Sequence, residues 1–123
     1  QPNPHVKEMS DVLMEALHAA LDRIKPGVTA GEVDEACRTV IEKAGYYMNF
    51  RKRTGYSVGL SWPEHISLKK DDPTVLKEGM TFHLPVALRD YGKAAVGFSV
   101  TVAVTEGGIE VLTELPTGIF VVE

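Results

Sequence analysis

Apolar residues in the first part of the chain recur at intervals of three and four, and this spacing limits the fold more than any other feature of the sequence. One such stripe spans Met9 to Ile24, and a second spans Val33 to Ala44. Residues at this spacing share one side of an α-helix, so each segment is predicted to be an amphipathic helix. The stripes consist of Met9, Val12, Leu13, Ala16, Leu17, Ala20, Leu21 and Ile24, and of Val33, Ala36, Cys37, Val40, Ile41 and Ala44.

The ends of these two helices are marked by specific residues. Pro26-Gly27 is predicted to stop the first helix, because proline has no backbone donor and glycine accepts left-handed backbone geometry. Thr29 and Glu32 have the spacing of a capping box, in which the Thr oxygen accepts from the Glu amide and the Glu carboxylate reaches back. Gly45 stands where a glycine often follows the last turn. Two antiparallel helices joined by a short turn are predicted.

The second half of the chain is rich in β-branched and aromatic residues, which is typical of strands. The predicted strands are Met80–Val86, Ala95–Val104, Ile109–Thr113 and Gly118–Val122, with one more over Tyr47–Arg51 or Thr54–Val58. Glu106-Gly107-Gly108 is predicted to be a hairpin turn, and Lys69 to Pro73 a polar loop. The predicted class is α+β, with the two helices covering one face of a mostly antiparallel, curved sheet.

The predicted strand Ala95–Val104 is apolar at nearly every position, as in a strand that is buried on both faces. Two helices cover only one face of a small sheet, so the other face and an edge need cover from outside the chain or from a second copy. We therefore expect a twofold homodimer. The face expected to need this cover carries Val96, Phe98, Val100, Val102 and Val104.

Composition narrows the class of protein. The 123 residues suit a single domain over 1–123, and 44% hydrophobic with 24% charged residues is ordinary for a soluble globular protein. A net charge of −4 gives no reason to expect nucleic acid or an anionic membrane as a partner. The single cysteine, Cys37, excludes an internal disulfide and a cysteine zinc cluster. The chain has no apolar run of about 20 residues and no signal-peptide layout, so a cytoplasmic location is expected.

Several segments resemble the second half of the pita-bread hydrolases, the superfamily of methionine aminopeptidase, prolidase and creatinase. Ala20 to Tyr46 resembles the helix, Pro-Gly turn and helix of that family. "GYSVGL", Gly55 to Leu60, stands where the family has a Gly-His-Gly-Ile-Gly-Leu run. Val75 to Val86 and Val100 to Gly108 are similar to its two closing strands. The variants "GYSVGLSWPEH" and "GMTFH" look closest to the ectoine hydrolase and creatinase branch.

The resemblance implies a fold about twice as long as this chain, with two similar halves related by a pseudo-twofold axis. It implies a C–N bond hydrolase whose dinuclear metal site takes two aspartates from the first half and further ligands from the second. On this reading the chain begins after the aspartates and is the C-terminal half of the catalytic domain.

The resemblance also assigns the remaining ligand positions. The metal histidine of the family falls on Tyr56, its substrate-orienting histidine on Pro63, and the glutamates of its closing strands on Pro85 and Ser99. A two-metal hydrolase needs carboxylates and imidazole, whereas a phenol is protonated at neutral pH and binds such metals poorly. We therefore predict no metal site and no cofactor, and retain Tyr56 and Ser99 only as substrate-binding candidates.

Creatinase-like relatives work without metal, through a histidine acid–base catalyst beside carboxylates. His83, His65 and Glu64 are the residues that could take such parts here. Each also has a structural interpretation, which we favour: a hydrogen-bonded strand histidine for His83, and a solvated loop pair for Glu64 and His65. Tyr56 could donate a hydrogen bond to a ligand or fill an emptied pocket.

For the other polar residues, a structural interpretation is favoured or no role is assigned. The basic run Arg51 to Arg53 could contact a substrate carboxylate, although a solvated strand end is the favoured interpretation. Cys37 lies on an apolar stripe and is expected to be a buried structural thiol. His5 and His18 have no acidic or cysteine partner at ligand spacing and receive no role.

Two function hypotheses follow. In the first, the chain is a truncated or degenerate member of the creatinase/prolidase/aminopeptidase-like hydrolases, inactive by itself. In the second, it is a non-catalytic binding or assembly module that keeps the scaffold. The expected partners are a second copy or the missing N-terminal half, with a small amide or dipeptide-like ligand.

Overall fold

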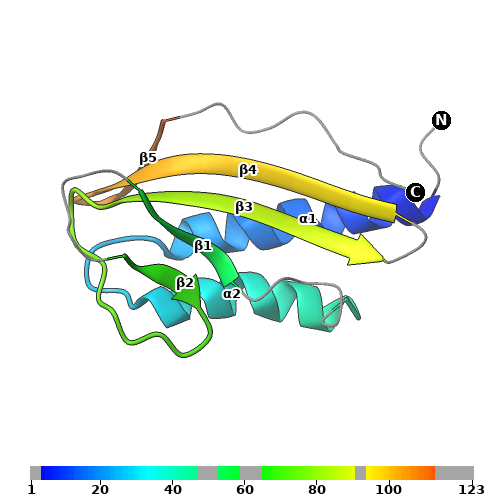
Figure 1. The fold of residues 1–123 in the computed structure, drawn as a ribbon, viewed down its shortest axis with the longest axis horizontal. Helices are drawn as coiled ribbons and strands as arrows, with labels where there is room; N and C mark the ends of the chain where they lie inside the picture. The colour runs from blue at the N-terminus through cyan, green and yellow to red at the C-terminus, as the bar shows by residue number, and fades with distance from the viewer. Residues whose placement is uncertain (1–3, 47–52, 59–64, 91–93, 113–123) are drawn as a thin grey trace.

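The chain folds as two helices packed on a single antiparallel sheet (Figure 1). The structure is a computed structural model that describes residues 4–46, 53–58, 65–90 and 94–112. The elements in chain order are α1 (Pro4–Arg23), α2 (Ala30–Lys43), β1 (Arg53–Val58), β2 (Ser67–Lys69), β3 (Thr81–Asp90), β4 (Ala94–Thr105) and β5 (Gly108–Val111). The strands are arranged in the order β2-β1-β3-β4-β5, and every neighbouring pair is antiparallel. The predicted α+β class is confirmed.

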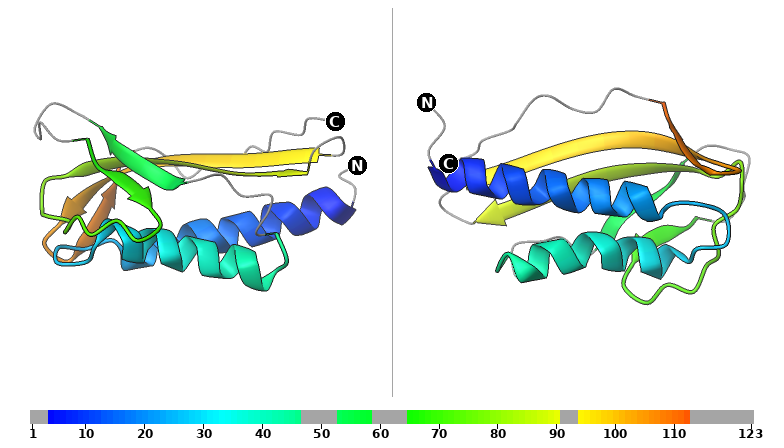
Figure 2. Two further views of the ribbon diagram at one scale, coloured as in Figure 1. Left: turned by 60° about the horizontal axis from the view of Figure 1, so that its bottom comes forward. Right: turned by 180° about the vertical axis from the view of Figure 1, so that it is seen from behind.

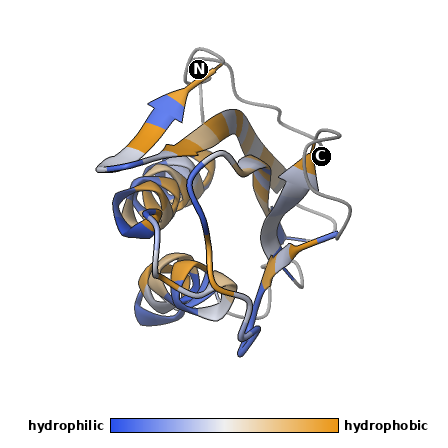
Figure 3. Cartoon of the chain, turned by 90° about the vertical axis from the view of Figure 1, so that its left-hand side faces the viewer, coloured by the Kyte–Doolittle hydropathy of each residue, from blue (hydrophilic) through white to orange (hydrophobic). Residues whose placement is uncertain are grey.

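Both helices lie on the same side of the sheet (Figure 2). Helix α1 contacts β3, β4 and β5, while α2 contacts β1 and β2. Seen along the helices, the sheet curves around them (Figure 3). The sheet therefore has a covered face, which meets the helices, and an open face, which is turned away from them.

The start of α2 follows the predicted capping arrangement in part. The Thr29 hydroxyl oxygen accepts a hydrogen bond of 3.2 Å from the Glu32 amide. The Glu32 carboxylate does not reach back, however, because it accepts a hydrogen bond of 3.0 Å from Arg23 at the end of α1. The turn between the helices contains Gly27 at φ 95°, a conformation that favours glycine. The carboxylate of the capping box thus joins the two helices.

The end of α2 is closed by the predicted glycine. Gly45 has φ 88° and its amide donates to the Glu42 carbonyl at 3.0 Å. The amide of Tyr46 donates to the Ile41 carbonyl, also at 3.0 Å. These two bonds make a Schellman motif, which satisfies carbonyls that the last turn would otherwise leave free.

The sheet contains most of the predicted strands. Met80–Val86 and Ala95–Val104 lie within the longer strands β3 and β4, and Thr54–Val58 lies within β1. The hairpin turn is confirmed by the pairing of Thr105 with Gly108. Strand β5 ends at Val111, two residues before the predicted end.

One strand was not predicted, and two predictions cannot be compared with the structure. Strand β2 is only three residues long and extends into the predicted polar loop at Lys69, so it has too few residues to show a strand pattern. The possible strand Tyr47–Arg51 and the predicted strand Gly118–Val122 lie outside the described residues.

The core lies between the helices and the covered face, and it corrects one prediction. The face of β4 expected to need a second copy is already buried by the helices of the same chain. Its side chains are Val96, Phe98, Val100, Val102 and Val104, each at most 6% exposed. Small side chains occupy the alternate positions, namely Gly97, Ser99, Thr101 and Ala103. The strand therefore alternates between large and small residues, and it is not an apolar strand buried on both faces.

The described helices include none that is long and apolar enough to cross a lipid bilayer.

The covered and open faces of β4 should respond differently to a negative charge. Phe98→Asp places a carboxylate in the core, and we expect it to destabilise the fold by on the order of 4 kcal/mol or more. Ser99→Asp places the same group on the exposed open face, and this variant should retain the helical circular dichroism of the original chain. Thermal unfolding of both variants checks that Phe98 lies on the covered face and Ser99 on the open face. This assignment of faces would be wrong if Ser99→Asp lowered the unfolding temperature more than Phe98→Asp.

Candidate functional site

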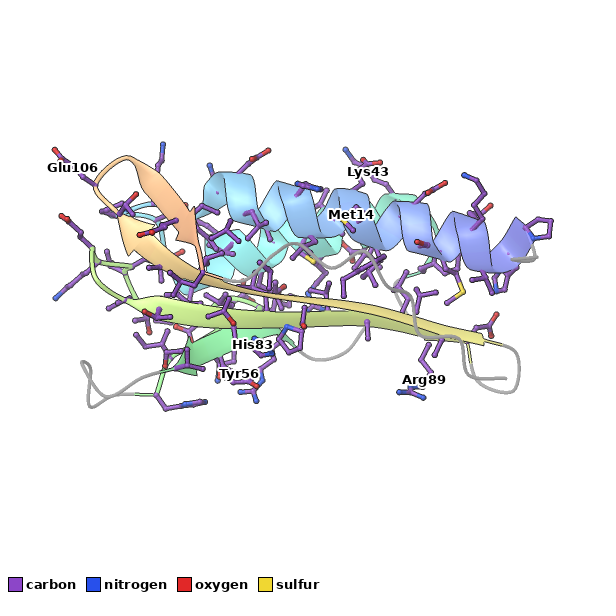
Figure 4. The ribbon with its side chains drawn as sticks, turned by 90° about the horizontal axis from the view of Figure 1, so that it is seen from above. Met14, Lys43, Tyr56, His83, Arg89 and Glu106 are labelled. Atoms are coloured by element: carbon purple, nitrogen blue, oxygen red, sulfur yellow. The ribbon has the colours of Figure 1, made fainter. Side chains whose placement is uncertain are left out.

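The central part of the open face brings together the positions that the sequence singled out. In the sheet register, Tyr56 of β1 is paired with His83 of β3, and Pro85 of β3 with Ser99 of β4. Figure 4 shows Tyr56 and His83 side by side on the side of the sheet opposite the helices, with Arg89 farther along on the same side. Three of the four assigned ligand positions thus lie on neighbouring strands of one face.

Tyr56 is the centre of a group of basic and aromatic side chains. Its ring meets the His83 ring edge-on with centroids 5.6 Å apart, and the His65 ring lies 6.1 Å away in a stacked orientation. The guanidinium carbon of Arg53 lies 4.8 Å from the Tyr56 ring centroid, within cation–π range. We call Arg53, Tyr56, His65 and His83 the Tyr56 cluster.

His83 is held in place from the neighbouring strand. Its Nδ1 lies 3.0 Å from the hydroxyl oxygen of Thr101, its register partner on β4. This contact agrees with the structural interpretation of a hydrogen-bonded strand histidine. The other ring nitrogen, Nε2, has no hydrogen-bond partner in the described part of the chain. The ring is thus positioned by one nitrogen and has a second available for a ligand.

Gly55 allows β1 to approach β3 closely enough to form this cluster. A β-carbon at this position would lie 2.5 Å from the His83 carbonyl oxygen and 3.0 Å from Cγ of Leu84. A contact of 2.5 Å with backbone is not possible without displacing the strand. The contact between Tyr56 and His83 therefore depends on a residue without a side chain at position 55.

A buried ion pair holds the start of β1 from the other side of the sheet. Asp34 of α2 is fully buried and accepts hydrogen bonds from the Thr54 amide at 3.1 Å and the Thr54 hydroxyl at 2.8 Å. Arg38 donates to the same carboxylate at 2.9 and 3.2 Å. Four donors thus compensate the cost of removing the charge from water. This pair was not predicted from the sequence, although Asp34 and Arg38 have the i, i+4 spacing of side chains that meet on a helix.

Cys37 lies next to this pair and has no sign of reactivity. Its side chain is fully buried, and burial raises the pKa of the thiol to about 12, with a smaller opposing effect from Thr54. A thiol in this state is almost entirely protonated near neutral pH and is a poor nucleophile. The prediction of a buried structural cysteine is confirmed.

A second polar cluster, far from Tyr56, joins the start of α1 to the end of β3. Nε2 of His5 lies 2.8 Å from a carboxylate oxygen of Asp90, and the Tyr46 hydroxyl donates to Glu8. Burial and this hydrogen bond raise the pKa of Tyr46 to about 12. His5 was assigned no role from the sequence because its partner is 85 positions away. The first contact joins α1 to the sheet, and the second joins α1 to the residues that follow α2.

A polar hollow lies beside α2. It is lined in part by Glu35, Arg38 and Lys70, on the side of α2 away from the open face. Its most buried charges, Asp34 and Arg38, already bind one another. The charges of Asp34 and Arg38 are therefore already compensated by one another.

Of the remaining candidate site residues, some lie on the surface near Tyr56 or Pro85 and others lie outside the described residues. His65 is exposed, and its ring stacks toward Tyr56. Ser99 is exposed on the open face, next to Pro85. Glu64 and Pro63 lie outside the described residues, as do Arg51 and Lys52 of the basic run.

A helix pair against one face of a curved antiparallel sheet, with a polar cluster on the other face, defines one half of a pita-bread domain. The chain belongs to metallopeptidase family M24, whose sequence pattern matches residues 1–106. Among solved structures it is similar to the Xaa-Pro dipeptidase from Bacillus anthracis, with a TM-score of 0.88, 30% identity and coverage of 96% of this chain and 33% of the other. The predicted superfamily and fold are confirmed.

Curated relatives agree with this assignment. The uncharacterized hydrolase/peptidase y4tL of Sinorhizobium fredii is 38% identical over 98% of this chain and 31% of its own length. The agropine synthesis cyclase of Rhizobium rhizogenes is also 38% identical, over 93% of this chain and 29% of its own length. The chain thus spans about a third of these relatives. The finer assignment to the ectoine hydrolase branch stays a prediction.

The residues present do not fit the dinuclear metal site of the family. A phenol, a pyrrolidine ring and a hydroxyl stand at Tyr56, Pro85 and Ser99, where carboxylates and imidazole would be needed. Across the described ranges, no three His, Cys, Asp or Glu side chains are grouped so that they could hold a metal ion. The side chains at these positions therefore lack the ligand chemistry that the resemblance implies for the family.

The buried carboxylate of Asp34 should be important for stability. Asp34→Asn removes the negative charge that Asp34 supplies to the Arg38 guanidinium, whose side chain is 13% exposed, and we expect a loss of about 3 kcal/mol in unfolding free energy. The matched control is Glu35→Gln, the same chemical change at the exposed neighbour, which should stay within about 0.5 kcal/mol of the original chain. Urea unfolding measures both, and equal losses would argue against the role of the buried pair.

Proposed function

We propose that this chain is a degenerate member of family M24 that has lost the dinuclear metal site and has no C–N bond hydrolase activity by itself. The observation that carries the proposal is the set of side chains at the centre of the open face. Tyr56 is adjacent to His83, and Pro85 is paired with Ser99, so these positions supply no carboxylate to bridge two cations.

The names of two relatives support a small amide or dipeptide-like compound as the class of ligand. One relative is called an Xaa-Pro dipeptidase and another an agropine synthesis cyclase. A small amide or dipeptide-like compound is therefore the ligand that we propose for the open face. Tyr56 and Ser99 are the residues proposed to contact it, and His83 or His65 would be the acid–base group if any activity remains.

The alternative is a binding or assembly module that uses the same scaffold without catalysis. It is supported by the small side chains of the open face on β4, from Gly97 to Ala103, which leave a surface that another molecule could contact. The two proposals agree on the lost metal site. They differ in whether a bound amide is ever cleaved.

Metal content and turnover test the main proposal together. After dialysis against manganese, cobalt or zinc, elemental analysis should find no stoichiometric metal, because the ligand set is missing. Incubation with an Xaa-Pro dipeptide should give no product, while a prolidase assayed in parallel does. About two bound ions per chain would overturn the proposal. Should weak cleavage occur, His83→Ala and His65→Ala would show whether either imidazole contributes.

We also propose that a second copy of the chain covers the open face. The resemblance implies that the two halves of the family domain are similar and face each other across a pseudo-twofold axis, so a second copy has a suitable shape. The interface would be isologous, with the same surface contributed by both copies. The cleft between them would contain Tyr56 and His83 from each copy.

The oligomeric state tests this second proposal. Light scattering at micromolar concentration should report a dimer, and Ser99→Asp should convert it to a monomer by placing like charges at the interface. His18→Asp introduces the same group on the exposed outer side of α1 and should leave the dimer intact. A monomer from the outset, or equal effects of the two variants, would rule out an interface on the open face.

A further inference from the structure

The part of the open face around Tyr56 carries an excess of positive charge, although the whole chain has a net charge of −4. Arg53 of β1 and Lys69 of β2 are register partners, so two cations lie directly opposite one another. Like charges in this position destabilise a pair of strands. His65 and His83 add two imidazoles to the same region. A negatively charged ligand would relieve this repulsion.

Several hydrogen-bonding groups of the Tyr56 cluster can act as donors, and they are available. In the described part of the chain, neither the Tyr56 hydroxyl nor Nε2 of His83 has a hydrogen-bond partner. Arg53 donates to the Ser67 hydroxyl at 2.9 Å and stacks on Tyr56, which orients its guanidinium while other N–H groups stay available. The cluster thus presents the Arg53 N–H groups, the Tyr56 O–H group and, in the tautomer protonated at Nε2, the His83 N–H group from two strands.

No hydrogen bond or ion pair joins a described carboxylate to Arg53, Tyr56 or His83. The acidic side chains of the helices are on the other side of the sheet, and Asp90 of β3 is bound to His5. Glu110, on β5, is the register partner of Ala103, two strands away from β3. The positive charge of Arg53 therefore has no acidic partner within the described chain.

We infer that the Tyr56 cluster is a binding site for a small carboxylate, which occupies the part of the open face where the family holds cations. The guanidinium of Arg53 supplies the permanent charge and a planar pair of donors that match a carboxylate. The Tyr56 hydroxyl and Nε2 of His83 donate to the same group, and His65 borders it. The inference deepens the proposed function and rests on it, since two metal ions and this anion would compete for the same space.

A titration with a matched pair of ligands tests the inference. N-acetylglycine carries a carboxylate, and N-acetylglycinamide has the same shape without the charge. Both are added to the intact 123-residue chain at constant ionic strength in EDTA, and the imidazole ring signals of His83 and His65 are followed by NMR. We expect saturable shifts with N-acetylglycine only. Because EDTA excludes metal, failure here counts against the anion site alone, whereas elemental analysis tests the missing metal pair separately.

Variants on the same face supply the controls. Arg53→Gln should weaken N-acetylglycine binding about tenfold or more, and Tyr56→Phe, which keeps the ring, should weaken it several-fold. Arg89→Gln removes a cation from the same face of β3 (Figure 4). At the rise of a strand its six residues of separation place it about 20 Å from His83, so this variant should have no effect. Amide spectra establish that each variant is folded.

Three results would overturn the inference. The first is an equal response to N-acetylglycine and N-acetylglycinamide, because binding would then not depend on the negative charge of the carboxylate. The second is equal weakening by Arg53→Gln and Arg89→Gln, which would indicate general electrostatic attraction to the face. The third is tighter binding of inorganic phosphate than of N-acetylglycine, which would assign the site to a different class of anion.

Discussion

The arrangement of the open face depends on one buried charge on the opposite side of the sheet. Asp34 binds both the amide and the hydroxyl of Thr54, so the first residues of β1 are held against α2. The next residue, Gly55, then lies against the backbone of β3, and the one after it, Tyr56, meets His83. A carboxylate in the core thus sets the position of a phenol on the surface, through three consecutive residues of one strand.

Local features of the fold were predictable from the sequence, and contacts between distant residues were not. The helix stripes, the Thr29 cap and the Gly45 end depend on neighbouring residues, and the structure has them. The contact of His5 with Asp90 and the binding of Thr54 by Asp34 join elements far apart in the chain, so no pattern indicates them. The prediction that β4 is buried on both faces was wrong. It rested on the apolar character of the strand and did not consider that large and small side chains alternate along it.

The candidate site was predictable to a similar degree. The resemblance indicated that Tyr56, Pro85 and Ser99 correspond to ligand positions, and the sheet register brings these positions together. What the sequence could not indicate was their new surroundings. Arg53 is close to Tyr56 in the chain, but its place over the ring depends on the strand geometry, and Ser67 comes from another strand. The consequence is a face whose charge is opposite to that of a carboxylate metal site.

The small residues of β4 on the open face have a consequence for any sheet that packs there. Facing sheets in ordinary sandwiches stand about 10 Å apart, because large side chains interdigitate between them. Gly97, Ser99 and Ala103 are too short to hold another sheet at that separation. Along β4 the intersheet spacing would therefore be narrower, and Tyr56 on β1 would act as a spacer toward one end. A layer covering this face would be expected to lie at an inclination to it, closer over β4 than over β1.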